Sequence, residues 1–221
     1  MKSVERCFGK NMRILKATRN NILTASRIVS KGGLVVYPTE TVYGLGCDPF
    51  NIGAVKRVFE AKGERRKPPP ILALSINHVK QIALMSQEGE KVAKKFWPGP
   101  LTLVFPKRLV LPDIVTCNLD SVGVRIPKHD VALRLISLSN GLLIGTSANR
   151  TGGKPPRTVH EATQQLKEAV DVFLDGGPAT LGKPSTVVDL TSKKPRILRE
   201  GPISLKEISD IISKKNKSTP N

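Results

Sequence analysis

Aromatic side chains are scarce in this sequence: they make up 4% of the residues, as one Trp, two Tyr and six Phe. Proteins that bind single-stranded nucleic acid without sequence preference stack the bases on aromatic side chains set in a basic groove. The sequence lacks that interleaving, and we expect most of its few aromatics to lie in the core. Val, Ile and Leu therefore have to supply most of the packing.

Cysteines and long apolar runs are also in short supply. The chain has three cysteines, Cys7, Cys47 and Cys117, and none belongs to a C-x-x-C pair. An odd number at such spacings argues against a disulfide framework and against a zinc ribbon. No run approaches the ~18 apolar residues of a membrane helix, and the first residues carry no apolar signal-peptide core. We therefore expect a cytoplasmic protein without a membrane partner.

Acidic residues are half as numerous as basic ones, 18 against 36, which gives a formal net charge of +18. An excess of this size attracts phosphate-rich partners and says nothing about the fold. From charge alone, two interpretations stay open. The chain is either a soluble protein that is merely rich in lysine, or one that binds a polyanion such as a nucleotide or a nucleic acid.

Helical and strand-like patterns alternate along the chain and predict an α/β fold, with helices packed on a sheet. Asn51 is expected to cap one helix, and Gly32-Gly33 to end the helix before it. The predicted helices cover residues 21–30, 52–59, 79–85, 88–96, 131–139, 161–169 and 205–212, and the predicted strands cover 34–37, 71–74, 101–105, 122–126, 142–146, 172–175, 186–190 and 197–198. A single domain over residues 12–213 and a polar, disordered tail over 214–221 complete the prediction.

Familiar catalytic motifs are incomplete or missing. Residues 177–183 match most of a phosphate-binding P-loop, but Pro184 stands where Ser or Thr should bind magnesium, and a strand-like segment follows where a helix is needed. The histidines, His78, His129 and His160, have no metal-ligand spacing, so we predict no metal site. No G-x-S-x-G segment points to Ser-His-Asp chemistry.

What remains is a series of polar segments, bounded by Gly and Pro, at the ends of predicted strands. Open α/β sheets bind ligands at such positions. The first segment, PTETVYGLGCD, starts at Pro38 directly after a buried strand. In another, VGVRIPKH, Arg125 interrupts an apolar strand and needs a partner from the protein or a ligand, because burying a lone charge is costly. Taken one at a time, these segments are equally compatible with ordinary connections.

Taken together and in order, PTETVYGLGCD, PGPLTLV, VGVRIPKH, TSAN, STVVDL and LREGPI resemble the YrdC family over residues 34–212. The resemblance implies a twisted, open, mixed α/β sheet with packed helices. It also implies a nucleotidyltransferase that makes threonylcarbamoyl-AMP and pyrophosphate from L-threonine, bicarbonate (or CO2) and ATP. A separate tRNA threonylcarbamoyltransferase would use the product to modify tRNA, and direct contact between this chain and tRNA or other RNA stays open.

The resemblance also assigns roles to residues. Lys62, Arg65 and Arg199 would be catalytic, because positioning and cationic stabilisation dominate phosphoryl transfer. The ATP-binding residues would be Lys62, Arg65, Arg66, Ser121, Asn149, Thr158 and Arg199, and the threonine-binding residues Thr39, Arg125, Ser147 and Ser185. Arg125 would bind the threonine carboxylate through two hydrogen bonds. Magnesium (Mg2+) would arrive with ATP, since the sequence has no evident carboxylate cluster.

The sequence departs from the family pattern in two places. The family motif K-x-R reads K-G-E here, so that Glu64 takes the position of a phosphate-binding cation. We expect Arg65 or Arg66 to reach the same space, because the arginine side chain is long. The loop after Asn149 also contains one additional glycine, in Gly152-Gly153.

Two alternative functions differ from threonylcarbamoyl-AMP synthesis. An RNA-binding protein of the same fold, with reduced or no catalysis, would suit the charge and the altered K-x-R motif, and its affinity would fall steeply with salt. A carbamoyl-adenylate step, as in the carbamoyltransferases that mature hydrogenase, suits the chain less well. Those proteins are far longer and carry zinc-finger and acylphosphatase-like segments that this sequence lacks.

Overall fold

The computed structural model describes residues 13–63, 67–192 and 194–213, and the tail predicted for residues 214–221 lies outside them. Two mixed sheets form the fold. The first has the order β1 (Arg13–Lys16), β9 (Val172–Asp175), β2 (Val35–Tyr37), β3 (Gly44–Gly46), β8 (Thr146–Ser147). The second has the order β11 (Arg196–Arg199), β10 (Thr186–Asp189), β5 (Leu101–Pro106), β6 (Ser121–Arg125), β4 (Ile71–Ala73), β7 (Leu142–Ile144). The predicted α/β class with open, mixed parallel and antiparallel pairing is confirmed. The strands form two sheets, whereas the sequence predicts one.

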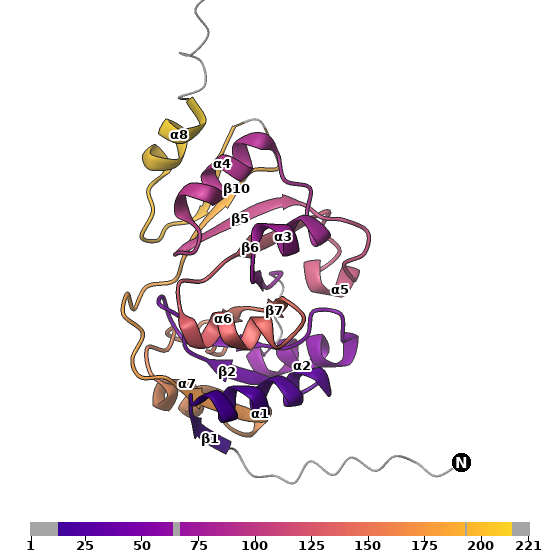
Figure 1. The fold of residues 1–221 in the computed structure, drawn as a ribbon, viewed down its shortest axis with the longest axis vertical. Coiled ribbons are helices and arrows are strands. Elements are labelled where there is room, and N and C mark those ends of the chain that lie inside the picture. The colour runs from indigo at the N-terminus through magenta and orange to yellow at the C-terminus, as the bar shows by residue number, and fades with distance from the viewer. Residues whose placement is uncertain (1–12, 64–66, 193, 214–221) are drawn as a thin grey trace, which may run out of the picture.

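Helices cover both sheets. They are α1 (Arg19–Ser30), α2 (Ile52–Lys62), α3 (Ile76–Ile82), α4 (Gln87–Phe96), α5 (Asp113–Thr116), α6 (Asp130–Ser137), α7 (Val159–Leu166) and α8 (Leu205–Ser213), with a 3-10 turn η1 (Lys167–Ala169) after α7. Figure 1 shows α3, α4 and α8 in the upper part, beside β5 and β10, and α1, α2 and α7 in the lower part, around β1 and β2. No helix within the described residues is long and apolar enough to cross a membrane.

Local signals explain where several helices start. The Asn51 side chain accepts a hydrogen bond from the Ala54 N–H at 2.9 Å, which confirms the predicted cap of α2. Thr18 and Ser86 cap α1 and α4 in the same way. Each cap satisfies a backbone N–H that has no partner within its own helix.

Branched aliphatic side chains fill most of the core, as the composition predicts. One cluster joins β3, β5 and β6 to α2 and α4, and a second joins β2 and β9 to α1 and α6. The aromatic side chains of Tyr37, Tyr43, Phe105 and Phe173 are fully buried within these layers. The sheet scaffold that carries the polar segments is therefore tightly packed on both sides.

The chain crosses from one sheet to the other at Gly145. The sequence predicts one strand over residues 142–146, but β7 ends at Ile144 in the second sheet and β8 begins at Thr146 in the first. A Cβ atom at Gly145 would lie 2.3 Å from Leu72 Cγ, so only glycine, which has no Cβ, lets the backbone pass this close to the Leu72 side chain. Polar segments on both sides of the crossing consequently lie close together.

Candidate active site

A cavity of about 60 Å³ lies where the segments of the two sheets meet. We call it the central cavity; it is lined by Thr41, Val42, Pro70, Leu72, Thr102, Arg125, Gly145, Thr146, Ser147, Pro184, Ser185 and Arg199. A smaller cavity of about 30 Å³ adjoins it, shares Arg125 and Ser147, and adds Thr39 to the lining. Two guanidinium groups and a set of hydroxyl groups thus face one space.

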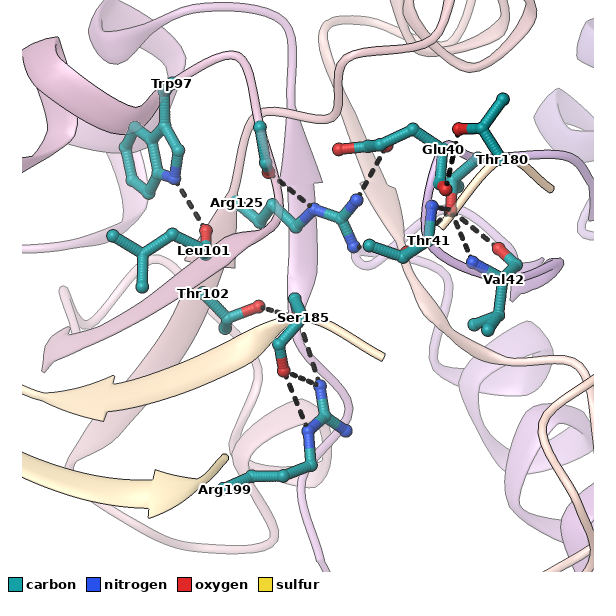
Figure 2. A network of polar contacts seen from close by, with 12 residues as sticks. Glu40, Thr41, Val42, Trp97, Leu101, Thr102, Arg125, Thr180, Ser185 and Arg199 are labelled. Atoms are coloured by element: carbon teal, nitrogen blue, oxygen red, sulfur yellow. Dashed lines mark hydrogen bonds and ion pairs between the residues drawn. The ribbon is translucent and has the colours of Figure 1, made fainter. Parts of the chain in front are cut away.

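Arg125 reaches the central cavity from the end of β6 (Figure 2). Its Nε donates to the Gly99 carbonyl at 3.0 Å, and its Nη1 donates to Thr41 Oγ1 at 3.0 Å. Its Nη2 lies 2.7 Å from Glu40 Oε2 in an ion pair whose side chains are only 7% and 9% exposed. Glu40 is therefore the protein partner that the position of Arg125 in an apolar strand requires.

The hydroxyl groups of Thr39 and Thr41 continue this network. Thr39 Oγ1 donates its only hydrogen to the Val42 carbonyl at 2.6 Å, so Thr41 has to be the donor in the 2.9 Å contact between the two hydroxyls. The hydrogen bonds therefore run from Arg125 to Thr41, then to Thr39, then to the backbone. Thr39 is 3% exposed and fixes this turn, while Thr41 lines the central cavity.

Arg199 approaches the opposite side of the central cavity from β11 (Figure 2). Its Nε and Nη2 donate to the Ser185 carbonyl at 3.0 and 2.8 Å, and Nη2 also donates to Ser185 Oγ at 3.0 Å. Ser185 Oγ lies 2.8 Å from Thr102 Oγ1 on β5. The two hydroxyl groups and the guanidinium therefore form one unit across β11, the segment before β10, and β5.

Lys62, at the end of α2, is 2% exposed. Its Nζ donates to the carbonyl oxygens of Ser147 and Asn149 at 2.7 and 2.6 Å, and so holds the segment that follows β8. The Asn149 side chain closes the next loop by donating to the carbonyls of Arg150 and Gly153 at 2.7 and 2.8 Å. The loop with the additional glycine is thus tied to the same segment.

The structure brings together most of the residues that the sequence predicts for the site. Arg125, Ser147, Ser185 and Arg199 line the central cavity, Thr39 lines the adjoining one, and Lys62 donates to the carbonyls of Ser147 and Asn149. Thr39, Lys62, Ser147 and Arg199 therefore lie in one region of the molecule. Their roles toward ligands stay predictions.

Four predicted residues lie elsewhere or outside the described chain. Ser121 starts β6, at the opposite end of the strand from Arg125, and pairs with Pro106. Thr158 accepts a hydrogen bond from the Glu161 N–H and caps α7. Arg65 and Arg66, like Glu64, fall outside the described residues.

Sequence reasoning did not single out Thr41, Thr102, Thr146 or Glu40. Thr102 has a signal that could have identified it, because it is a lone polar residue in the apolar strand LTLV. Glu40 stands in the first polar segment, but only the fold reveals that it pairs with Arg125.

Burial shapes the ionisation of the surrounding groups. Desolvation raises the pKa of Tyr43 to about 12 and keeps its phenol neutral, and its hydroxyl donates to the Gly177 carbonyl at 2.6 Å. Desolvation likewise raises the pKa of Tyr37 far above the ordinary range and lowers the pKa of His129.

Within the part of the chain that the structure describes, no three His, Cys, Asp or Glu side chains gather as metal ligands. The expectation that magnesium arrives with ATP stays a prediction.

Comparison with known families tests the resemblance. The Sua5–YciO–YrdC family model, described as "Telomere recombination", matches residues 27–201. The chain belongs to this family. Among curated members, the threonylcarbamoyl-AMP synthase of Pyrococcus abyssi (strain GE5 / Orsay) is 42% identical over 195 residues, which cover 86% of this chain and 57% of the relative. The putative threonylcarbamoyl-AMP synthase of Mycobacterium tuberculosis (strain CDC 1551 / Oshkosh) is 36% identical over 193 residues, with 86% and 88% covered.

Solved structures agree with this family assignment. P. abyssi Sua5 complexed with L-threonine superposes with a TM-score of 0.86 at 40% identity, over 91% of this chain and 60% of the other. Escherichia coli YciO has a TM-score of 0.81 at 24% identity, over 90% and 99%, and supports the fold alone. This chain thus spans a little over half of the P. abyssi family member and nearly all of the shorter ones.

Proposed function

We propose that this chain synthesises threonylcarbamoyl-AMP from L-threonine, bicarbonate (or CO2) and ATP, for the threonylcarbamoyladenosine modification of tRNA. The observation that carries the proposal is the convergence of Arg125, Arg199 and five hydroxyl side chains on the central cavity, from segments of both sheets. The relatives described as threonylcarbamoyl-AMP synthases support the same reaction, at 36% and 42% identity.

The reaction joins two anions. The amine of threonine adds to CO2 and loses a proton, which gives a carbamate. A carbamate oxygen then attacks the α-phosphorus of ATP, the bond from that phosphorus to the β-phosphate bridging oxygen breaks, and pyrophosphate leaves. Charge accumulates on the phosphoryl oxygens and on the leaving group, so fixed cationic donors in a confined site lower the barrier.

The geometry suggests how the chain divides this task. Arg125 and Ser185 would hold the amino acid, and Arg199 would face the phosphates from the other side of the same cavity. Lys62 would act by fixing the carbonyls of Ser147 and Asn149, since its ammonium already donates to both. Magnesium would be bound by the ATP phosphates, because the described residues that line the central cavity include no Asp or Glu.

Mass spectrometry of the product tests the proposal. Purified protein should form threonylcarbamoyl-AMP only when threonine, bicarbonate and ATP are all present, and serine should not replace threonine. Arg199→Met should abolish most product. Arg196→Met, on the same strand but with a side chain 73% exposed, is the matched control and should keep it.

A failure would be equally informative. Absence of product with all three substrates, or product that does not depend on threonine, would refute the enzymatic proposal. If such a protein bound tRNA with an affinity that fell steeply as salt increased, the RNA-binding alternative would take its place.

A further inference from the structure

Thr102 occupies a locked position in the wall of the central cavity. It lies on β5 between β10 and β6, pairs with Val187 of β10, and is 2% exposed. A Cβ atom at Gly123 of β6 would lie 3.3 Å from Thr102 Cγ2, so the methyl group packs over this glycine. The hydroxyl group points instead to Ser185 Oγ, 2.8 Å away. A β-branched side chain with both branches engaged in this way has one favoured rotamer.

Hydrogen counting shows that this hydroxyl pair has a donor to spare. Ser185 Oγ accepts a hydrogen bond from Arg199 Nη2 at 3.0 Å. The contact between Ser185 and Thr102 uses one of the two hydroxyl hydrogens, and neither hydroxyl has another acceptor within the described residues. One O–H group therefore remains for an acceptor in the central cavity, which both residues line.

We infer that Thr102 is a positioning residue, which donates to Ser185 and so directs the Ser185 O–H toward the carboxylate of the bound amino acid. The role rests on the proposed function. Donors from both Arg199 and Thr102 would polarise Ser185 Oγ, and hydrogen bonds in such a chain strengthen one another. Thr102 thereby acts on the amino-acid substrate through Ser185 and makes no contact with ATP.

Three variants test this role. Thr102→Val keeps the shape and removes the hydroxyl, Thr102→Ser keeps the hydroxyl and removes the methyl group, and Gly123→Ala displaces the methyl group by a few tenths of an ångström without touching the hydroxyl. The matched control is Thr116→Val, because Thr116 is fully buried and its hydroxyl donates to the Asp113 carbonyl, outside the cavity lining. Steady-state kinetics should be measured with threonine and with ATP as the varied substrate, together with threonine binding by calorimetry and with Tm.

Thr102→Val should raise both KM and Kd for threonine about tenfold, the usual effect of one lost hydrogen bond, and change kcat and the KM for ATP by less than about twofold. Thr102→Ser should restore most of the affinity, and Gly123→Ala should weaken it to a smaller extent. Thr116→Val should leave both KM values unchanged. If Thr102→Val does not fold, the serine and Gly123 variants still decide the matter through the threonine KM.

Two kinds of failure can be told apart. If the wild type forms product and Thr102→Val binds threonine equally well, or loses ATP affinity to the same degree, the role of Thr102 is refuted and the proposed function stands. The role is refuted in the same way if Thr102→Ser recovers nothing or Gly123→Ala has no effect. If the wild type neither binds threonine nor forms product, both the proposed function and the role of Thr102 are refuted.

Discussion

The ion pair between Glu40 and Arg125 gives the sharpest prediction about stability. Both side chains are less than 10% exposed, so little water can reach the guanidinium to replace the carboxylate once it is removed. Removing one partner of such a buried pair costs about 3–5 kcal/mol. In a chain of this size each kcal/mol shifts Tm by about 2–4 °C. Glu40→Ala should therefore lower Tm by roughly 6–20 °C in a thermal melt followed by circular dichroism.

Two further variants separate lost charge compensation from lost packing. Glu40→Ala combined with Arg125→Met removes both charges and should melt above the Glu40→Ala protein, since an uncharged pair needs no counter-charge. Arg196→Ala breaks the pair with Asp189, in which the arginine side chain is 73% exposed, and should cost at most ~1 kcal/mol.

The outcome that contradicts this reasoning is specific. If Glu40→Ala melted within about 2 °C of the wild type, the guanidinium would have found water or another partner, and its burial would not be what fixes Arg125. If the double variant melted below the single one, the packing of the Arg125 side chain would contribute more to stability than the compensation of its charge. The network in Figure 2 would then stabilise the protein through packing contacts alone.

Three other predictions follow from the same structure. The hydrogen bond from Lys16 holds the pKa of Asp175 below its usual 3.8, and the stability that it gives is complete above that value and is lost as pH falls through the lowered pKa. Asp175→Asn should therefore lower the free energy of unfolding at neutral pH and approach the wild type in strong acid. An equal difference in the free energy of unfolding at both pH values would contradict this. Burial raises the pKa of the Cys47 thiol to about 12, so iodoacetamide at mildly alkaline pH should label this thiol only after the protein has unfolded. Peptide mass spectrometry measures the labelling, and labelling of the native protein would refute the burial of Cys47. In Gly201→Ala the new Cβ would lie 2.3 Å from the backbone nitrogen of Thr186, so we expect a lower Tm and loss of product formation. A variant as stable and as active as the wild type would show that the backbone moves to relieve this contact without cost.

Local sequence signals predict most of the secondary structure, because they act within a few residues. The Asn51 cap is where the sequence places it, and β9 has the predicted bounds, Val172–Asp175. The strand β3 was missed because Gly44-Leu45-Gly46 has low strand propensity. Its glycines are explained only by tertiary contact: a Cβ at Gly46 would lie 2.3 Å from the Ile144 carbonyl oxygen. The sequence alone contains no trace of that neighbour.

The division into two sheets escaped prediction for a related reason. Strand order depends on pairing between segments far apart in the chain, and periodicity reports only which face of a strand is buried. The crossing at Gly145 turns one predicted strand into two, one in each sheet. The short strand β1 and the helix α5 also went unnoticed, since four residues show too little of a period.

Membership of a motif did not decide which site residues were predicted, since the missed residues Glu40, Thr41, Thr102 and Thr146 all lie within the motifs. Ser185 and Arg199 come from two segments of the resemblance and share hydrogen bonds. Thr102 also lies in a motif, but its importance depends on the register of β5 and β10, which brings it beside Ser185. Such register information is not local, so residue type and spacing could not reveal it.

The cationic groups of this site have protein acceptors already in place. Arg125 donates to Gly99 and Thr41, Arg199 donates to Ser185, and Lys62 donates to two carbonyl groups. Their orientation is therefore set before a ligand arrives, and fixed dipoles of this kind stabilise developing charge without reorganising during the reaction. The acceptors of Lys62 and Arg199 lie at Ser147, Asn149 and Ser185, beside the places where the chain passes between the two sheets. The same crossings that join the sheets thus hold Lys62 and Arg199 in position, so substitutions that loosen the crossings should impair binding even where they leave every cation unchanged.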